Sequence, residues 1–219
     1  MAFAASARKP KSGLATQRVS GHLDRLMSKQ PPQLYFDFVD PISYLMEIEV
    51  RKVESRLSWN FERIGFELRP PPLSVTTWED PTWSPRIVTA GKLAADIDLT
   101  LDPPPLIPWS RKAHELYLWA SEKGVGTEAR SSIFKAYFLQ GVDIGRIDEL
   151  VTMAQTWGLD PTETKAVLDV DRFAKAVVLA RTEAESKQIA EVPTIVTPGN
   201  QHIQGFHNDR DLSTLLGSP

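Results

Sequence analysis

The chain has 219 residues, of which 42% are hydrophobic, enough for one large domain or two modest ones with a buried core. Its formal net charge of −3 gives no overall basic field to draw it to nucleic acid or an anionic membrane. No run approaches the roughly 20 apolar residues that span a bilayer, and the N-terminus lacks a continuous apolar signal segment, which predicts a cytoplasmic protein. The sequence contains no cysteine, which excludes disulfide exchange, a thiolate nucleophile and a thiolate metal site.

Residues 1–30 are rich in basic side chains and hold a single acid, Asp24. We predict a disordered tail over residues 1–17, followed by a short helix through His22, Leu23, Leu26 and Met27. An organelle transit peptide is the alternative for such a basic start, but nothing else in the chain supports import.

The next segment predicts a βαβ unit. Residues 34–39 form a short apolar and aromatic run, long enough for a buried strand. Pro41 suits the first turn of a helix, and Leu45, Ile48, Val53 and Leu57 give that helix an approximate buried face. Residues 59–68 are then expected to return as a second strand.

A proline-rich stretch follows over residues 69–108 and holds nine of the 17 prolines. A compact domain rarely keeps so long an irregular loop unless the loop covers a site. We therefore interpret this stretch as a lid or a partner surface that contains two short helical turns.

Residues 111–189 show helical periodicity in several successive stretches. Gly158 ends the third of these helices. Asp160 is the expected N-cap of the next one, with Pro161 at its first position and Glu163 at its third. The last helix is predicted over residues 171–187.

The C-terminal residues predict a β-hairpin and a short helix. Residues 192–196 and 201–206 are the two strands, joined by a turn through residues 198–200, and residues 209–216 are the helix. The order βαβ, helices, ββα is that of an α/β thioredoxin fold interrupted by an all-helical insertion domain. The predicted domains are residues 31–108 with 190–219 (thioredoxin-like) and residues 109–189 (helical).

Three stretches resemble the DsbA-like superfamily, whose fold is of this kind. Residues 35–45 resemble the entry from strand to helix, residues 132–144 the helical insert, and residues 192–194 the cis-proline turn. At the helix entry, the positions of the superfamily's two reactive thiols are Asp40 and Ser43.

Within that superfamily the sequence is most similar to 2-hydroxychromene-2-carboxylate isomerases, kappa-class glutathione transferases and FrnE-type proteins. The isomerases and kappa transferases have Ser-Pro-x-Ser at the thiol positions and an Asn-Asp-Arg or similar tripeptide after the hairpin, here Asn208, Asp209 and Arg210. The resemblance covers about residues 33–217. It implies glutathione or another low-molecular-weight thiol as cofactor, Asp40 and Ser43 as catalytic residues, and Val192, Pro193 and the tripeptide as cofactor-binding residues.

Each of these residues also has a structural interpretation. Asp40 can be the helix N-cap and Ser43 a first-turn residue that caps its own backbone. A carboxylate at position 40 would repel a thiolate at the helix N-terminus unless it is protonated. Pro193 can be an ordinary edge-strand proline, and Asn208 or Asp209 a second N-cap.

The histidines predict no further site. His114 is expected to be a packing residue. No set of histidine and acidic residues has metal-ligand spacing on one helix face, so we predict no metal site.

Two functions are therefore expected. The first is an isomerase or transferase that uses a thiol cofactor on a small aromatic substrate. The second is a catalytically inactive DsbA-like module that binds a protein partner or serves as an assembly subunit, for which a homodimer is one form.

Overall fold

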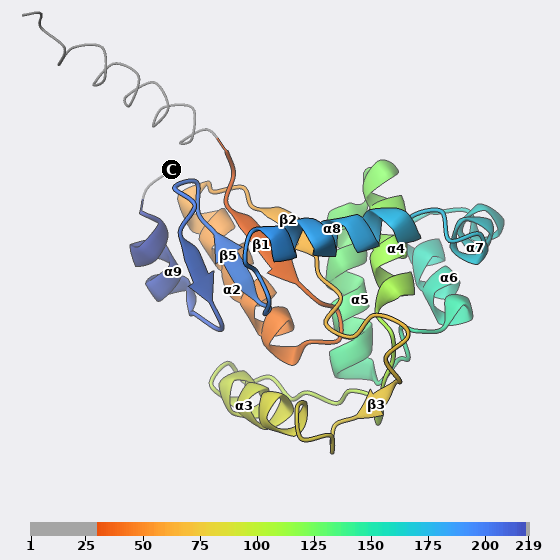
Figure 1. The fold of residues 1–219 in the computed structure, drawn as a ribbon, viewed down its shortest axis with the longest axis horizontal. Coiled ribbons are helices and arrows are strands. Elements are labelled where there is room, and N and C mark those ends of the chain that lie inside the picture. Colours follow the sequence, from red (N-terminus) through yellow and green to blue (C-terminus); the bar gives the residue numbers. More distant parts are fainter. Residues whose placement is uncertain (1–29, 218–219) are drawn as a thin grey trace, which may run out of the picture.

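A four-stranded mixed sheet lies at the centre of the computed structural model, which describes residues 30–217 (Figure 1). The strands follow the order β2-β1-β5-β6 across the sheet. Strand β1 pairs in parallel with β2, while β1 with β5 and β5 with β6 are antiparallel. The four strands are β1 (Gln33–Phe36), β2 (Glu62–Gly65), β5 (Thr194–Val196) and β6 (His202–Gln204).

Helices cover both faces of this sheet, and the order of the described elements is that of a thioredoxin fold with helices inserted between its halves. The predicted fold class is confirmed. The helices are α2 (Pro41–Leu57), α3 (Ser84–Ala95), α4 (Arg111–Glu122), α5 (Gly126–Gln140), α6 (Ile147–Thr156), α7 (Pro161–Asp169), α8 (Ala174–Ser186) and α9 (Asp209–Leu216). The tail and short helix predicted before residue 30 lie outside the described residues.

Both faces of the sheet are covered. Helices α2 and α9 pack on one face, where Leu34 and Ile195 of the sheet meet Met46, Val50 and Leu212. Helix α8 lies across the other face and reaches toward α4 (Figure 1), and its Ala184 joins a core cluster with Tyr35 and Phe66. The segment predicted as an insertion therefore also supplies one layer of the thioredoxin domain.

The predicted boundaries hold for several elements and need correction for the strands. Asp160 accepts a hydrogen bond from the Glu163 amide at 2.7 Å, as a helix N-cap does. The predicted hairpin forms, but its strands are three residues each, Thr194–Val196 and His202–Gln204, and not residues 192–196 and 201–206. The two strands expected over residues 34–39 and 59–68 are only four residues each, however. Residues 37–39 instead form the turn into α2, where the Asp40 amide bonds to the Asp37 carbonyl at 3.2 Å.

The proline-rich stretch is more ordered than the two short helical turns predicted for it. It contains the twelve-residue helix α3 and a small ladder between β3 (Thr76–Thr77) and β4 (Leu106–Ile107). Helix α3 packs against α2 through a cluster in which Ala90 and Ala94 contact Ile42 and Leu45. This packing fixes α3 beside the first turn of α2.

A large aromatic core joins the sheet to the helical part. Tyr44 of α2 stacks on Phe134 and Phe138 of α5, with ring centroids 5.5 and 5.4 Å apart, and Phe36 and Phe38 lie beside Phe134. Aromatic pairs of this kind stabilise the folded state beyond the contribution that comes from burying their apolar surface. Within residues 30–217, no helix is long and apolar enough to cross a membrane.

Candidate functional site

Asp40 is the N-cap of α2 and is completely buried. Its Oδ2 accepts hydrogen bonds from the Ser43 amide and the Ser43 hydroxyl, each at 2.7 Å. The Asp-Pro pair creates this arrangement locally, because an N-cap carboxylate accepts from a backbone N–H three residues later while Pro41 needs no partner for its nitrogen. Asp40 therefore has the position and the hydrogen bonds of a helix N-cap.

Ser43 is also completely buried, and it connects two carboxylate residues. Its hydroxyl donates to Asp40 and accepts from the Asp37 amide at 3.4 Å. Both hydrogen-bonding roles of the hydroxyl are therefore filled by the protein itself.

The second oxygen of Asp40 is bound by Arg86, a residue that no local sequence pattern connects with Asp40. Arg86 Nη1 lies 2.7 Å from Asp40 Oδ1 and also donates to the Val192 carbonyl at 3.2 Å. Its Nη2 donates to Glu191. Arg86 belongs to the first turn of α3, so the packing of α3 on α2 brings this cation to the start of α2.

The electrostatics of Asp40 follow from this environment. Burial raises the pKa of the Asp40 carboxyl, because ionisation without water is costly, while Arg86 and the Ser43 hydrogen bonds act in the opposite direction. Burial has the larger effect, so the pKa lies above its ordinary value of 3.8. A carboxyl group with a raised pKa and a neighbouring hydroxyl fits acid or base chemistry.

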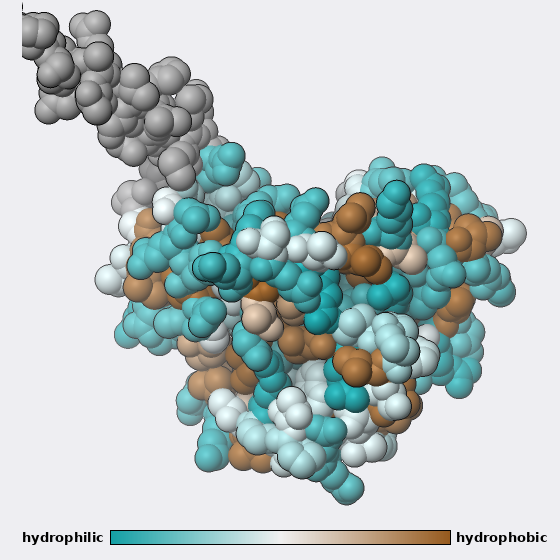
Figure 2. All heavy atoms as spheres, viewed as in Figure 1, coloured by the Kyte–Doolittle hydropathy of each residue, from teal (hydrophilic) through white to brown (hydrophobic). Residues whose placement is uncertain are grey.

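The peptide bond before Pro193 is cis, and Arg86 Nη1 links its Val192 carbonyl to the Asp40 carboxylate. A hollow of about 330 Å³ opens next to this peptide bond, and its wall includes Ile42, Arg86, Thr89, Val192 and Pro193. Figure 2 shows the surface hollowed between α3 and the part formed by the sheet and α8. We call Asp40, Ser43, Arg86, Val192 and Pro193 the Asp40 site.

A ligand in the hollow would meet Arg86 before it met Asp40. The Arg86 side chain is 22% exposed, whereas that of Asp40 is fully covered. Arg86 can therefore contact an anionic group directly, and Asp40 and Ser43 hold the guanidinium in place.

The structure does not bring the tripeptide into the Asp40 site. Asn208 is the N-cap of α9, with its side chain accepting from the Arg210 and Asp211 amides at 3.0 Å. The Asp209 carboxylate binds Arg56 at 2.7 Å, and its amide binds Glu49 at 2.9 Å. Glu49 and Arg56 stand about 12 and 22 Å along α2 from Pro41.

His114 and Asp37 form a buried pair behind the site. His114 Nε2 lies 3.2 Å from Asp37 Oδ1, and Asp37 Oδ2 accepts from the Leu68 amide at 2.7 Å. The ring also lies 4.9 Å from the ring of Phe38, as its expected packing role requires. Across the described part of the chain, no three histidine, aspartate or glutamate side chains are grouped so that they could hold a metal ion.

Comparison with known proteins identifies relatives across nearly the whole described chain. YwbO, an uncharacterized protein of Bacillus subtilis (strain 168), is 28% identical over 171 residues, which cover 75% of this chain and 84% of YwbO. A probable DsbA oxidoreductase from Streptomyces coelicolor superposes with a TM-score of 0.74 at 18% identity, over 85% of this chain and 88% of its own. A 2-hydroxychromene-2-carboxylate isomerase superposes with a TM-score of 0.69 at 16% identity, over 85% and 92%.

The two structural similarities concern the fold alone. The family is identified by a different comparison, in which the model of the DSBA-like thioredoxin domain matches residues 33–216. The sequence contains no cysteine, so the chain has no dithiol. The chain belongs to the family of DSBA-like thioredoxin domains.

Proposed function

We propose that this chain is a non-redox enzyme of its family, an isomerase or a kappa-type transferase that acts on a small aromatic substrate with glutathione or a similar thiol as cofactor. One observation carries the proposal: Arg86, held by the buried Asp40 carboxylate, reaches the carbonyl of Val192 in a hollow lined by Pro193. A cation in that position suits a ligand carboxylate or a thiolate.

The ligand is expected to take the place of Glu191 on Arg86. The Glu191 side chain is 65% exposed, so it can turn into water at little cost when an anion binds the guanidinium. Asp40 stays in place, because its Oδ2 is held by Ser43. Asp40 and Ser43 thus act as the acid or base pair behind the ligand, and Arg86 as the group that binds it.

One structural neighbour supports an aromatic carboxylate as the substrate class. The name of the 2-hydroxychromene-2-carboxylate isomerase gives an aromatic carboxylate as the substrate of that protein. Arg86 offers the planar donor pair that binds a carboxylate through two parallel hydrogen bonds.

Calorimetric titration with glutathione tests the proposal. We expect the parent protein to bind glutathione weakly. Asp40→Ser should bind it about tenfold more tightly, because one negative charge next to the thiol is removed and Arg86 is freed for the ligand. Arg86→Met should bind it about tenfold more weakly.

Arg51→Met is the matched control, because Arg51 is an exposed arginine of α2 whose side chain bonds to Ser131 at 3.1 Å. It should bind glutathione as the parent does. If neither the parent nor Asp40→Ser binds glutathione at millimolar concentration, the thiol-dependent enzyme is ruled out.

A second candidate function, a non-catalytic binding module, is favoured by a different observation. Both Asp40 oxygens and the Ser43 hydroxyl already have protein partners, so the site has the hydrogen bonds of a structural cap. The proline-rich stretch exposes Val75 and Leu106 around a hollow of about 350 Å³, and the next residue, Trp109, adds a third exposed apolar side chain. Such a patch suits a protein interface, and a homodimer is the simplest form of it.

Light scattering coupled to size exclusion tests the module. A dimer that Trp109→Ala converts to a monomer, with glutathione binding absent, is the expected result for a module of this kind. A monomer at all concentrations in both proteins counts against the homodimer.

A further inference from the structure

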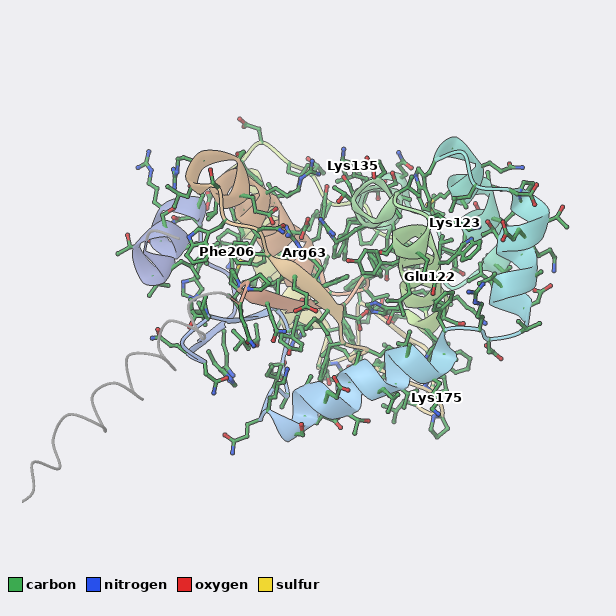
Figure 3. All side chains as sticks on the ribbon, turned by 90° about the horizontal axis from the view of Figure 1, so that it is seen from above. Arg63, Glu122, Lys123, Lys135, Lys175 and Phe206 are labelled. Atoms are coloured by element: carbon green, nitrogen blue, oxygen red, sulfur yellow. The ribbon has the colours of Figure 1, made fainter. Side chains whose placement is uncertain are left out.

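A second pocket lies between the edge strand β2 and helices α4 and α8, and it shares no lining residue with the hollow of the Asp40 site. Its volume is about 300 Å³, at the small end of the range for small-molecule sites. Apolar and aromatic side chains line it, among them Tyr35, Tyr117, Leu118, Val177 and Ala180. Figure 3 shows α8, which carries the labelled Lys175, passing beside both the sheet and the helices of the helical part. We call this cavity the β2 pocket.

His114 contributes an unused hydrogen-bond acceptor to the lining. Because the Asp37 carboxylate can only accept, the neutral imidazole carries its proton on Nε2, which faces Asp37 at 3.2 Å, and Nδ1 is left as an acceptor. Nδ1 is buried and has no hydrogen-bond partner within the described residues, while the whole side chain is 2% exposed. An unmet buried acceptor is costly, so a ligand that donates a hydrogen bond would relieve this cost.

The backbone of Gly65 lies close against the His114 ring and leaves no room for a side chain beside Nδ1. A Cβ on Gly65 would stand 2.4 Å from His114 Nδ1, far closer than two such atoms approach. Gly65 is not among the residues with positive φ, so its backbone does not require glycine. A residue without a side chain is therefore required at position 65 because the backbone there lies so close to the His114 ring.

The rim of the β2 pocket carries charges of both signs that lack ion-pair partners in the described part of the chain. Lys187 Nζ contacts the Tyr35 hydroxyl at 3.1 Å and no carboxylate. Glu62 accepts from Gln33 at 2.7 Å, and Glu183 has no side-chain partner. A lysine beside two carboxylates matches the carboxylate and ammonium groups of a zwitterion.

We propose that the β2 pocket binds a free aromatic amino acid whose ring carries a hydrogen-bond donor, of the tyrosine type. The ring lies against Tyr117, Leu118 and Val177, and its hydroxyl donates to His114 Nδ1. The carboxylate faces Lys187, and the ammonium group faces Glu62 and Glu183. This activity is separate from the function proposed for the Asp40 site.

Calorimetry of the full chain with four compounds tests the proposal. L-tyrosine should bind saturably. L-phenylalanine lacks the hydroxyl, tyramine the carboxylate and 3-(4-hydroxyphenyl)propionate the amine, and each should bind about tenfold more weakly, because each leaves one polar group of the pocket unmatched. Excess glutathione should leave the tyrosine affinity unchanged. No saturable binding of tyrosine, equal affinity for tyrosine and phenylalanine, or displacement by glutathione would each overturn the proposal.

Two variants locate the binding in the β2 pocket. Gly65→Ala places a methyl group against His114 and should abolish tyrosine binding, whereas Gly91→Ala, with nothing within 4 Å of its new Cβ, should not change it. Lys187→Ala alters an exposed side chain and should weaken binding about tenfold, so it serves as the test if Gly65→Ala does not fold. If Lys187→Ala binds tyrosine as tightly as the parent does, tyrosine does not bind in the β2 pocket.

Discussion

Arg63→Met is expected to lower the free energy of unfolding by about 3–5 kcal/mol, the largest effect of any single substitution considered for this chain. Only 4% of the Arg63 side chain is exposed. Its Nε donates to Glu47 at 3.1 Å, its Nη2 to Glu54 at 2.7 Å, and its Nη1 to Glu54 and to the Phe61 carbonyl at 2.9 Å. Figure 3 shows the side chain between the sheet and the helical part.

The cost arises because Glu47 stays buried and Glu54, whose side chain is 22% exposed, stays partly buried when the arginine is removed. Glu47 keeps one cation, Arg130, at 2.9 Å, but Glu54 loses the partner that holds it ionised. Burial acts to raise the pKa of Glu54, and the hydrogen bonds and charge of Arg63 outweigh it, so the pKa lies below 4.5. A lowered carboxyl pKa stabilises the folded state at neutral pH, and this stabilisation is lost as the pH falls through the folded-state pKa.

Urea unfolding at several pH values measures this effect. The deficit of Arg63→Met should be largest at neutral pH and should shrink as the pH falls below about 4.5, where Glu54 becomes protonated in the unfolded chain. Arg146→Met is the matched control, because Arg146 and its partner Asp148 are 59% and 66% exposed, and it should change the free energy of unfolding by at most about 0.5 kcal/mol. An Arg63→Met deficit no larger than that of Arg146→Met would contradict the argument.

The fold could be predicted because its signals are local. Asp40-Pro41 begins α2 through an N-cap hydrogen bond, and Asp160-Pro161 with Glu163 begins α7 in the same way. Capping joins atoms three residues apart, so the sequence alone determines them. The same reasoning explains why the N-cap alternative for Asn208 describes its geometry.

The strands were predicted too long because an apolar run does not show where pairing ends. Residues 37–39 are as buried as the strand before them, yet they form the turn into α2. Burial and strand pairing are separate properties, and hydrophobic pattern reports only the first. Beyond the end of β1, the Asp37 side chain accepts a hydrogen bond at 2.7 Å from the Leu68 amide, which follows β2.

The composition of the Asp40 site could not be predicted, because it depends on packing between distant segments. Arg86 lies 46 residues from Asp40 along the chain. One local signal was available: Pro85 stands at the first turn of α3, and Ala90 and Ala94 follow at helical spacing. Nothing in the sequence, however, says that α3 packs on the first turns of α2, or that α9 packs near Glu49 and Arg56 and keeps Asp209 away from Asp40.

Because Asp40 depends on that distant cation, Arg86→Met is expected to lower the free energy of unfolding by about 2–3 kcal/mol at neutral pH. Removing Arg86 leaves the completely buried Asp40 carboxylate with Ser43 alone, and the Val192 carbonyl loses a donor. The value is below that for Arg63 because the Arg86 side chain is partly exposed, at 22%.

The loss of stability in Arg86→Met is expected to depend on pH. The pKa of Asp40 is already raised by burial, and Arg86 is the main group that opposes the rise, so Arg86→Met raises it further. A carboxyl pKa raised above its unfolded value favours the folded state only below the unfolded pKa of about 3.8, and this contribution is lost as the pH rises. The stability gap between the parent and Arg86→Met should therefore open steadily from pH 4 to pH 7 in urea unfolding. Glu191→Gln removes the exposed partner of the same guanidinium and should show almost no gap. The gap between Asp40→Asn and Asp40→Asn/Arg86→Met should not vary with pH, because neither protein contains a carboxyl at position 40. A flat gap for Arg86→Met would mean that Asp40 does not ionise against Arg86, and the account of the site as a cation held by a buried carboxylate would fall with it.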